Sequence, residues 1–269
     1  MPVDATPDLA LLDRARAGDT RAVEQLLARH EVRVYRYGLR MCGNEDDARD
    51  VLQETLLAAF RNLGAFRGDA QLSTWLYQIA RSFCIKQRRR REGEPAQHED
   101  TEGLEVRRVA SDTPQSDSHT HAHEVGTLIQ AAIATLPAEH REALVLRDVE
   151  GLSAEEAAEV VGIEVGALKS RLHRARMALR EQLAAVLDER PAAVACPELA
   201  QELTAYAASE IDQATCAVIE DHLSRCPRCS AACESLKKTV SMCRAIPGGD
   251  VPAPVKAAVR AALRRSAVG

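Results

Sequence analysis

Aromatic side chains make up only 3% of this chain, and their scarcity argues against an all-β fold, in which aromatic and β-branched residues fill the strands. No run of apolar residues approaches the ~20 needed to cross a bilayer, so we expect no transmembrane helix. The first residues, MPVDATPDLALLDRARAGD, lack a basic segment followed by an apolar core and do not resemble a signal peptide. We therefore expect a cytoplasmic protein without a membrane contact.

Disulfides are unexpected in that compartment, yet the sequence contains eight cysteines. Cys42 and Cys84 are isolated, whereas the other six lie between Cys196 and Cys243. Clustered thiols in a reducing compartment indicate a metal site or a thiol sensor.

The length of 269 residues leaves room for two or three compact domains, and abundant Ala, Leu, Arg and Glu favour helices. The net charge of −5 conceals two basic stretches, at residues 86–91 (KQRRRR) and 169–180. Such stretches are candidate contacts to nucleic acid.

Apolar periodicity predicts three helices within residues 8–62 and a fourth that runs into the basic stretch 86–91. Asp19 and Asn44 are suited to cap the second and third of these helices. Residues 92–123 contain few apolar side chains and several acids, so we expect a flexible linker there.

Helical periodicity returns at Val125 and continues to about Leu187. Pro137 is placed to open one helix, and Ser153 and Glu156 have the spacing of a capping box for another. After a hinge at 191–194, four short helices are expected at 197–207, 213–225, 229–245 and 252–264.

The predicted fold is all-α, with two helical domains, a linker and a small metal-binding domain. The predicted boundaries are 1–91, the flexible acidic linker 92–124, 125–187, the cysteine-rich domain 196–246 and a C-terminal extension with a short helix, 247–269.

Residues 152–176 combine a short helix, a glycine turn and a basic helix. Gly162 permits the tight turn, and apolar side chains on both helices supply a shared buried side. This pattern is typical of a helix-turn-helix, whose second helix enters the DNA major groove. The alternative is a helical hairpin with a solvated basic face. The candidate DNA contacts here are Lys169, Ser170, Arg171, Arg174 and Arg176.

The stretch 46–55 offers a polar outer face on a predicted helix, which either binds a partner or is simply solvated. Further along, a polar loop at 66–73 and the only tryptophan, Trp75, precede the basic helix. Aromatics beside a cationic groove suit unstacked bases. We expect Trp75 mainly in the core and favour the loop as the base contact.

Four motifs follow one another along the chain: Asp47-Ala48-x-Asp50-x-x-Gln53-Glu54, Thr74-Trp75-Leu76-x-x-Ile79-Ala80-Arg81, Leu136-Pro137 with Leu144, and Leu168-Lys169-Ser170-Arg171-Leu172-x-Arg174-Ala175-Arg176. In this order they resemble the extracytoplasmic-function (ECF) sigma factors of the sigma-70 family, over about residues 8–187. Two departures bear on promoter recognition rather than on the class: Ser82 stands where that family usually has asparagine, and an acid common in the family is missing around 84–86.

The resemblance implies that residues 1–91 are sigma region 2, which binds the β′ clamp of core RNA polymerase and opens the −10 element. Residues 125–187 would be region 4, which reads the −35 element and meets the β flap. The implied clamp contacts are Asp46, Asp50, Gln53 and Glu54. The implied −10 contacts are Arg67 and Asp69, in a loop that holds an extruded base, with Arg88 and Arg89 beyond it.

The C-terminal cysteines contain the pattern H-x3-C-x2-C, formed by His222, Cys226 and Cys229. His222 and Cys226 lie one helical turn apart, and Cys196 can supply a fourth ligand. One histidine and three cysteines make a closed tetrahedral Zn²⁺ site. The tail resembles the zinc-binding anti-sigma fold over about residues 196–245, and the whole chain resembles the CorE-like, metal-dependent type of sigma factor. Unrelated reduced thiols are the alternative.

Three further cysteines, Cys216, Cys233 and Cys243, are candidate extra ligands for copper, cadmium or a second zinc, or participants in thiol–disulfide switching. Metal sensing is the favoured interpretation, and a permanent zinc that only folds the domain is the alternative. The linker also contains three histidines, His119, His121 and His123. We interpret them as solvated; the alternative is that they are accessory metal ligands.

An enzyme is not expected, because four protein ligands close the zinc site and no thioredoxin-like βαβ pattern surrounds the C-x2-C motif. The sequence therefore predicts a sigma factor that binds core RNA polymerase and promoter DNA and is regulated by metal or thiol redox state at its own tail through an intramolecular contact. The alternative is a tail that is structural or binds a partner.

Overall fold

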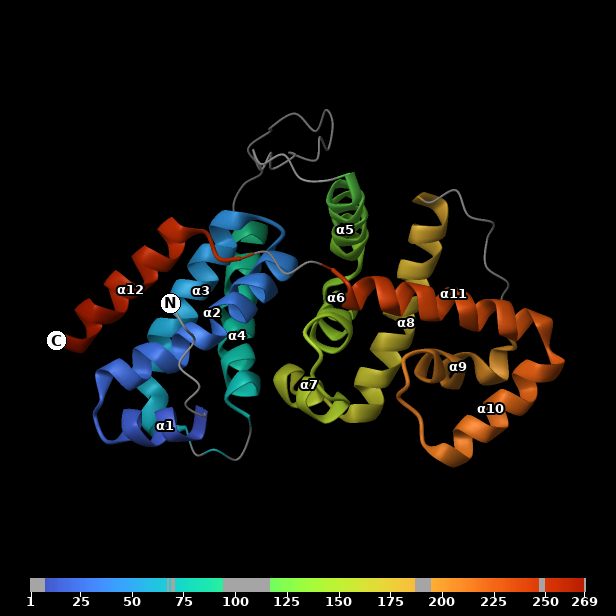
Figure 1. Cartoon of the computed structure of the whole chain (residues 1–269), viewed down its shortest axis with the longest axis horizontal. Coiled ribbons are helices and arrows are strands. Elements are labelled where there is room, and N and C mark those ends of the chain that lie inside the picture. The colour runs from blue at the N-terminus through green and yellow to red at the C-terminus, as the bar shows by residue number, and fades with distance from the viewer. Residues whose placement is uncertain are drawn as a thin grey trace.

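The computed structural model describes residues 8–66, 68, 71–93, 117–186, 195–246 and 250–268, and every regular element in these ranges is a helix. The all-α prediction is confirmed. Figure 1 shows three bodies in a row: an N-terminal bundle (α1–α4), a middle bundle (α5–α8) and a small body formed by η3 and α9–α11. We call η3 to α12 the C-terminal tail; its last helix, α12, lies on the N-terminal bundle rather than with the small body.

Two helices of the N-terminal bundle begin at the residues that the sequence indicates. The Asp19 side chain accepts hydrogen bonds from the backbone N–H groups of Arg21 and Ala22, and Asn44 accepts one from Asp47, so both predicted N-caps are confirmed. The bundle consists of α1 (Asp8–Arg16), α2 (Thr20–Cys42), α3 (Glu45–Asn62), the 3-10 turn η1 (Leu63–Ala65) and α4 (Leu72–Gly93).

The middle bundle also follows its predicted signals. Ser153 and Glu156 form the capping box at the start of α7, and Gly162 ends that helix in the left-handed conformation with φ 74°. The bundle consists of α5 (Asp117–Thr135), α6 (Ala138–Leu144), the π-helical turn η2 (Val145–Val149), α7 (Ala154–Val161) and α8 (Val165–Val186).

Helix α5 starts at Asp117, within the stretch 92–124 that was predicted as linker. The first turns of α5 are polar, so apolar periodicity, which marks only helices with a buried side, does not reveal them. The rest of the predicted linker, residues 94–116, lies outside the described residues.

The C-terminal tail contains the four predicted short helices. Pro227 occupies the first position of α11, where its missing N–H costs no hydrogen bond. The tail consists of η3 (Pro197–Leu199), α9 (Ala200–Ala207), α10 (Gln213–Arg225), α11 (Pro227–Arg244) and α12 (Ala253–Val268).

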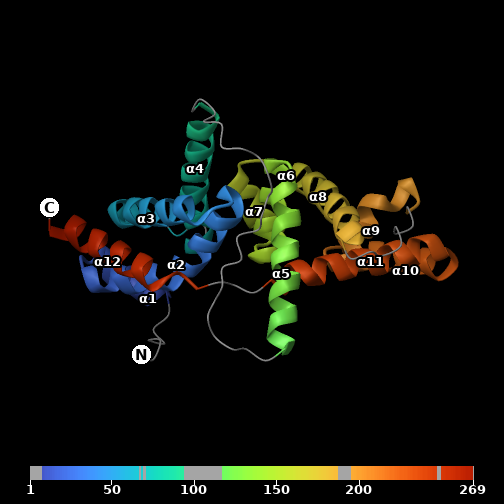
Figure 2. The ribbon, with the colours of Figure 1, turned by 90° about the horizontal axis from the view of Figure 1, so that it is seen from above.

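The tail spans the molecule. Helices α9–α11 lie at one end, beside α8, whereas α12 lies at the other end, along α2 and α3 (Figures 1 and 2). Val255, Val259 and Leu263 of α12 belong to the main hydrophobic core, which runs through both bundles. Leu203, Ile219 and other apolar residues of α9–α11 form a separate, smaller core. The tail is thus one small domain plus one helix added to a distant bundle.

Candidate metal centre and nucleic-acid interface

Four residues of the tail gather as the sequence predicts. The ligand atoms of Cys196, His222, Cys226 and Cys229 all lie within 4.8 Å of one another. His222 and Cys226 come from the end of α10, Cys229 from the first turn of α11, and Cys196 from the residue before η3. The backbone N–H of Cys196 also donates a hydrogen bond to Cys229 Sγ, 3.3 Å away.

These residues fit a zinc ion. Zinc–sulfur bonds of about 2.3 Å in a tetrahedron separate the sulfurs by roughly 3.8 Å, which is compatible with the observed spread. The Nε2 atom of His222 is buried and has no hydrogen-bond partner among the described residues. A buried nitrogen of this kind is costly unless it binds something, and a metal ion would satisfy it. When bound, zinc would crosslink the start of the tail, α10 and α11.

The thiols of the cluster are not equivalent. A backbone hydrogen bond from Cys229, together with the neighbouring Cys229, His222 and Cys196 side chains, lowers the pKa of Cys226 to about 7, against the opposing effect of desolvation. Hydrogen bonding to Cys229, desolvation and the proximity of Cys226 raise the pKa of Cys196 to about 11. Since the thiolate is the form that binds metal, Cys226 binds zinc near neutral pH more readily than Cys196 does.

The three further cysteines do not join this cluster. Cys216 lies on α10 with its sulfur 3.5 Å from Glu220 Oε1. Cys233 is buried in the small core of the tail, and Cys243 is buried in the main core. Among the described residues, none of these three cysteines shares a metal site with the four residues above. The linker histidines lie in the first turns of α5, whose side chains are outside the described residues: His119, His121 and His123.

The predicted helix-turn-helix is formed by α7, the turn at Gly162 and α8. Lys169 and Arg174 of α8 are exposed and Ser170 is half-buried. Arg171 is also half-buried and pairs with Glu139 of α6, with 3.2 Å between Arg171 Nη2 and Glu139 Oε2.

Arg176, which the sequence predicts as a DNA contact, is buried and does not lie on the outer face of α8. Its side chain is 2% exposed and donates to both oxygens of Asp148, at 2.6 and 2.8 Å. It also donates to Glu210 in the loop between α9 and α10, at 2.8 and 3.1 Å. Although burial disfavours the charged guanidinium, the two carboxylates raise the pKa of Arg176. We call Arg176, Asp148 and Glu210 the Arg176 ion cluster; it replaces the predicted DNA contact in this arrangement.

The tail covers one side of α8 around this cluster. His173 Nδ1 lies 2.8 Å from Thr204 Oγ1 of α9, and Met177 packs against the small core of the tail. Lys169 lines a groove between α8 and α9. The predicted DNA contacts therefore divide: Lys169 and Arg176 face the tail, whereas no tail contact is described for Ser170, Arg171 or Arg174.

The other candidate nucleic-acid contacts are placed only in part. Arg67 and Asp69 lie outside the described residues. Arg88 and Arg89 are exposed near the end of α4. Trp75 is half-buried and packs against the main core, and its ring contacts that of Phe66 with centroids 5.1 Å apart. This agrees with the expectation that Trp75 is mainly a core residue.

The candidate polymerase contacts share α3. Asp46, Asp50 and Glu54 are exposed and Gln53 is half-buried. They stay accessible although α12 packs along the same helix, because α12 lies against a different face that includes Leu56. Gly38 sets the close crossing of α2 and α3, since a Cβ there would approach the Ala48 backbone to 3.3 Å.

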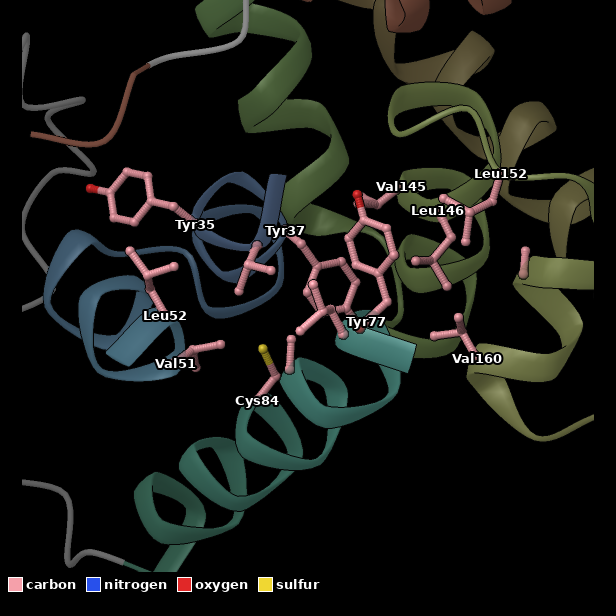
Figure 3. Close-up of a cluster of buried hydrophobic side chains, with 14 of the residues drawn as sticks. Tyr35, Tyr37, Val51, Leu52, Tyr77, Cys84, Val145, Leu146, Leu152 and Val160 are labelled. Atoms are coloured by element: carbon pink, nitrogen blue, oxygen red, sulfur yellow. The ribbon is translucent and has the colours of Figure 1, made fainter. Parts of the chain in front are cut away.

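Sequence patterns did not reveal how the two bundles meet. Glu150, with only 1% of its side chain exposed, accepts from Arg40 at 3.0 Å and from the Tyr77 hydroxyl at 2.9 Å. Glu142 accepts from the Tyr37 hydroxyl at 2.9 Å and from Arg81 at 2.8 Å. Figure 3 shows Tyr37 and Tyr77 of the N-terminal bundle facing apolar residues of the middle bundle. An acid in a helical pattern is normally solvated, so nothing in the sequence distinguished these two.

No helix among the described residues is long and apolar enough to cross a membrane.

Comparison with known families assigns each body of the structure. Residues 26–94 match the family model of sigma-70 region 2, and residues 127–179 match that of sigma-70 region 4. Residues 196–230 match a zinc-finger family model.

Curated relatives agree with these matches. The chain is 35% identical over 196 residues to the ECF RNA polymerase sigma factor SigE of Mycolicibacterium smegmatis, which covers 68% of this chain and 70% of the relative. It is 33% identical over 186 residues to the RNA polymerase sigma-H factor of Pseudomonas aeruginosa, which covers 68% of this chain and 96% of the relative. Among solved structures, CnrH in complex with the cytosolic domain of CnrY aligns with a TM-score of 0.48 and 28% identity, over 67% of this chain and 97% of that one.

Proposed function

Because this chain belongs to the ECF sigma factors, a family of transcription factors rather than enzymes, we propose that its two bundles recognise the promoter and that its own C-terminal tail restrains them. The observation that carries this proposal is that the tail contacts both bundles at once. Glu210 reaches Arg176 in region 4, the middle bundle, and α12 packs on α2 and α3 of region 2, the N-terminal bundle.

The division of roles follows the placement of the candidate residues. In region 2, the exposed face of α3 would bind the β′ clamp of core polymerase, and Arg67, Asp69, Arg88 and Arg89 would hold the opened −10 element. In region 4, Ser170, Arg171 and Arg174 would read the −35 element, and the same bundle would meet the β flap. Cationic side chains at both sites would make binding dependent on salt concentration.

The closed packing of the two regions supports a restrained state. The −10 and −35 elements are separated along the DNA, so two regions that bury Glu142 and Glu150 between them cannot reach both elements together. The tail favours this closed state because one part of it holds region 4 and the other holds region 2. Opening would require the tail to release at least one of the two.

The metal centre is the proposed control point. Zinc bound by Cys196, His222, Cys226 and Cys229 would fix α10 to α11 and thereby hold Glu210 in place against region 4. Loss of zinc, oxidation of its ligands, or replacement by a softer ion such as copper or cadmium would alter the small domain and weaken its hold. A ligand can shift such an equilibrium only by binding the two states with different affinity. The proposed type is therefore a metal- or redox-dependent sigma factor of the CorE-like kind.

The test is transcription in vitro with core polymerase and the promoter upstream of this protein's own coding sequence. Four preparations are compared: the zinc-loaded full chain, the metal-free chain, the chain with added copper or cadmium, and the zinc-loaded Val259→Asp variant, in which α12 loses its buried apolar contact. The zinc-loaded chain should give the lowest yield, and the Val259→Asp variant should exceed it several-fold.

Ala258→Asp is the matched control, because Ala258 neighbours Val259 on α12 and is exposed. It should behave as the unaltered chain does. Equal transcription from the zinc-loaded chain and from Val259→Asp would show that the tail does not restrain the sigma regions and would leave it as a structural or partner-binding domain.

A further inference from the structure

Two cysteines that are isolated in the sequence meet in region 2. Cys42 and Cys84 are 42 positions apart, yet their sulfur atoms are separated by 3.6 Å. Cys42 is the last residue of α2, and Cys84 lies in α4 beside the buried cluster (Figure 3). Neither belongs to the zinc cluster of the tail.

The geometry suits a disulfide. An S–S bond is about 2.05 Å long, so the sulfurs need to approach by roughly 1.5 Å. Cys42 is partly exposed and precedes Gly43, which ends α2 with φ 79° and where an added Cβ would meet no atom within 4 Å. Cys42 thus lies at an open corner between α2 and α3, so the sulfurs can meet through a local rearrangement of the end of α2.

We propose that Cys42 and Cys84 are a redox-active thiol pair that a hydroperoxide converts to an intramolecular disulfide. The Cys42 thiolate attacks one peroxide oxygen, the O–O bond breaks, and the products are a sulfenic acid on Cys42 and one water or alcohol. The Cys84 sulfur then attacks the Cys42 sulfur, the S–O bond breaks, and the hydroxyl leaves as water with the Cys84 proton. Two thiols lose two electrons and the peroxide gains them.

The surroundings assign the two roles. The hydrogen bond to Cys42, burial and the nearby acids Glu142 and Asp47 raise the pKa of Cys84, which therefore stays protonated and acts second. Cys42 is the more accessible thiol, and Arg141 of region 4 lies close to it. Burial and the neighbouring Arg88 lower the pKa of Arg141, while the negative charge of a Cys42 thiolate opposes that shift. A guanidinium whose charge interacts with the Cys42 sulfur favours the thiolate form that attacks.

The pair lies next to the interface at which region 4 packs on region 2. Next to Cys42, the Met41 carbonyl accepts a hydrogen bond from Arg141 at 3.4 Å, and one turn before Cys84, Arg81 donates to Glu142. A disulfide would join the two elements of region 2 that receive α6. Oxidation would thus act on the contact between the two regions, separately from the zinc centre. Disulfides of this kind in a reducing compartment are transient and sense redox state.

The experiment uses the full-length, zinc-loaded protein treated with a small molar excess of hydrogen peroxide. Remaining thiols are alkylated without reduction, and trypsin then releases Cys42 in the peptide 41–49 and Cys84 in the peptide 82–86. Mass spectrometry should detect these two peptides joined by a disulfide that dithiothreitol cleaves. The midpoint of thermal unfolding of the oxidised protein should rise by about 5 °C or more, because the crosslink closes a long loop.

Two variants complete the test. Cys42→Ser, at a partly exposed site that tolerates a small polar side chain, should abolish both the joined peptide and the rise in the unfolding midpoint. Cys216→Ser, which removes a partly exposed thiol of the tail, should leave both unchanged. Recovery of Cys42 and Cys84 as alkylated thiols while tail cysteines are oxidised would overturn the proposal and leave the pair as core packing. A disulfide from either residue to a tail cysteine would overturn it as well.

Discussion

The C-terminal tail holds the two sigma regions with different chemistry. On region 4, apolar packing of Met177 and Cys243 accompanies a buried ion cluster. In this cluster Arg176 binds both Asp148 and the tail residue Glu210, and Glu210 also pairs with Arg147, 3.1 Å away. On region 2, the contact is an apolar stripe of α12, and its ion pairs are long: 3.8 Å from Lys256 to Glu31 and 3.8 Å from Arg264 to Glu24.

The difference bears on how each contact can open. A buried ion cluster has strict geometry, and removing one partner leaves a buried charge uncompensated. An apolar stripe is non-directional, and its contribution scales with the area removed from water. Region 4 should therefore be held in one fixed orientation, whereas α12 should detach as a unit with little effect on the fold beneath it. The two contacts can be tested separately by substitution.

Removal of Arg176, the cation shared by Asp148 and Glu210, should have the largest effect on stability. Arg176→Ala leaves Asp148 buried without its partner, and region 4 should lose about 3–5 kcal/mol of stability. Hydrogen exchange of α8 would measure this loss locally. Tryptophan fluorescence would not, because the only tryptophan, Trp75, lies in region 2. Arg174→Ala, on the exposed side of the same helix, is the matched control and should change the protection of α8 by less than about 0.5 kcal/mol. Equal losses in the two variants would mean that the ion cluster does not hold region 4.

Disruption of the apolar contact between α12 and region 2 should have the second-largest effect on stability. Val259→Asp removes a buried valine from the interface, and the free energy of opening of α12 should fall by roughly 2–3 kcal/mol. Exchange in residues 253–268 should accelerate while that of α2 and α3 remains protected, because α12 detaches from a bundle that has its own core. Ala258→Asp should leave exchange in α12 nearly unchanged. Global loss of protection in region 2 would contradict the view that α12 is an added helix.

Local signals in the sequence predicted most of the helices. Asp19, Asn44 and the Ser153–Glu156 box act within a few residues of their own positions, so a pattern search finds them. Gly162 does so as well, because the left-handed turn that it forms is a local requirement. The same holds for His222 and Cys226, which lie one helical turn apart and therefore gather wherever the helix goes.

Contacts between distant segments could not be predicted in this way. Arg176 carries the same basic signal whether it faces DNA or Asp148, and Glu210 is an ordinary surface acid until the tail folds back onto region 4. Cys42 and Cys84 looked isolated because their meeting depends on how α2 crosses α4. Each of these sites depends on tertiary packing, which apolar periodicity does not encode.

The tail's own share of the ion cluster can be measured apart from Arg176. Glu210→Gln keeps the shape of the side chain and removes its charge. Asp148 still compensates Arg176, whereas Arg147 loses its ion pair with Glu210. We expect the tail to lose about 1–2 kcal/mol of its hold on region 4, the contribution of hydrogen bonds to a charged partner. The readout is hydrogen exchange of α9 in the zinc-loaded protein. Glu202→Gln, an exposed acid on α9, controls for the change in net charge, and an equal effect of both variants would assign the loss to charge rather than to the contact.

The smallest effect should come from the ion pairs of α12. The Arg264 side chain is 72% exposed and its pair with Glu24 spans 3.8 Å, so Arg264→Ala should weaken docking by no more than about 0.5 kcal/mol. For the same reason, raising the salt concentration should barely change exchange in α12, because screening acts on exposed charges and not on the apolar stripe. Release of α12 by salt alone would show that charge attraction, not burial of Val259 and its neighbours, holds this helix, and the contrast between the two contacts of the tail would then disappear.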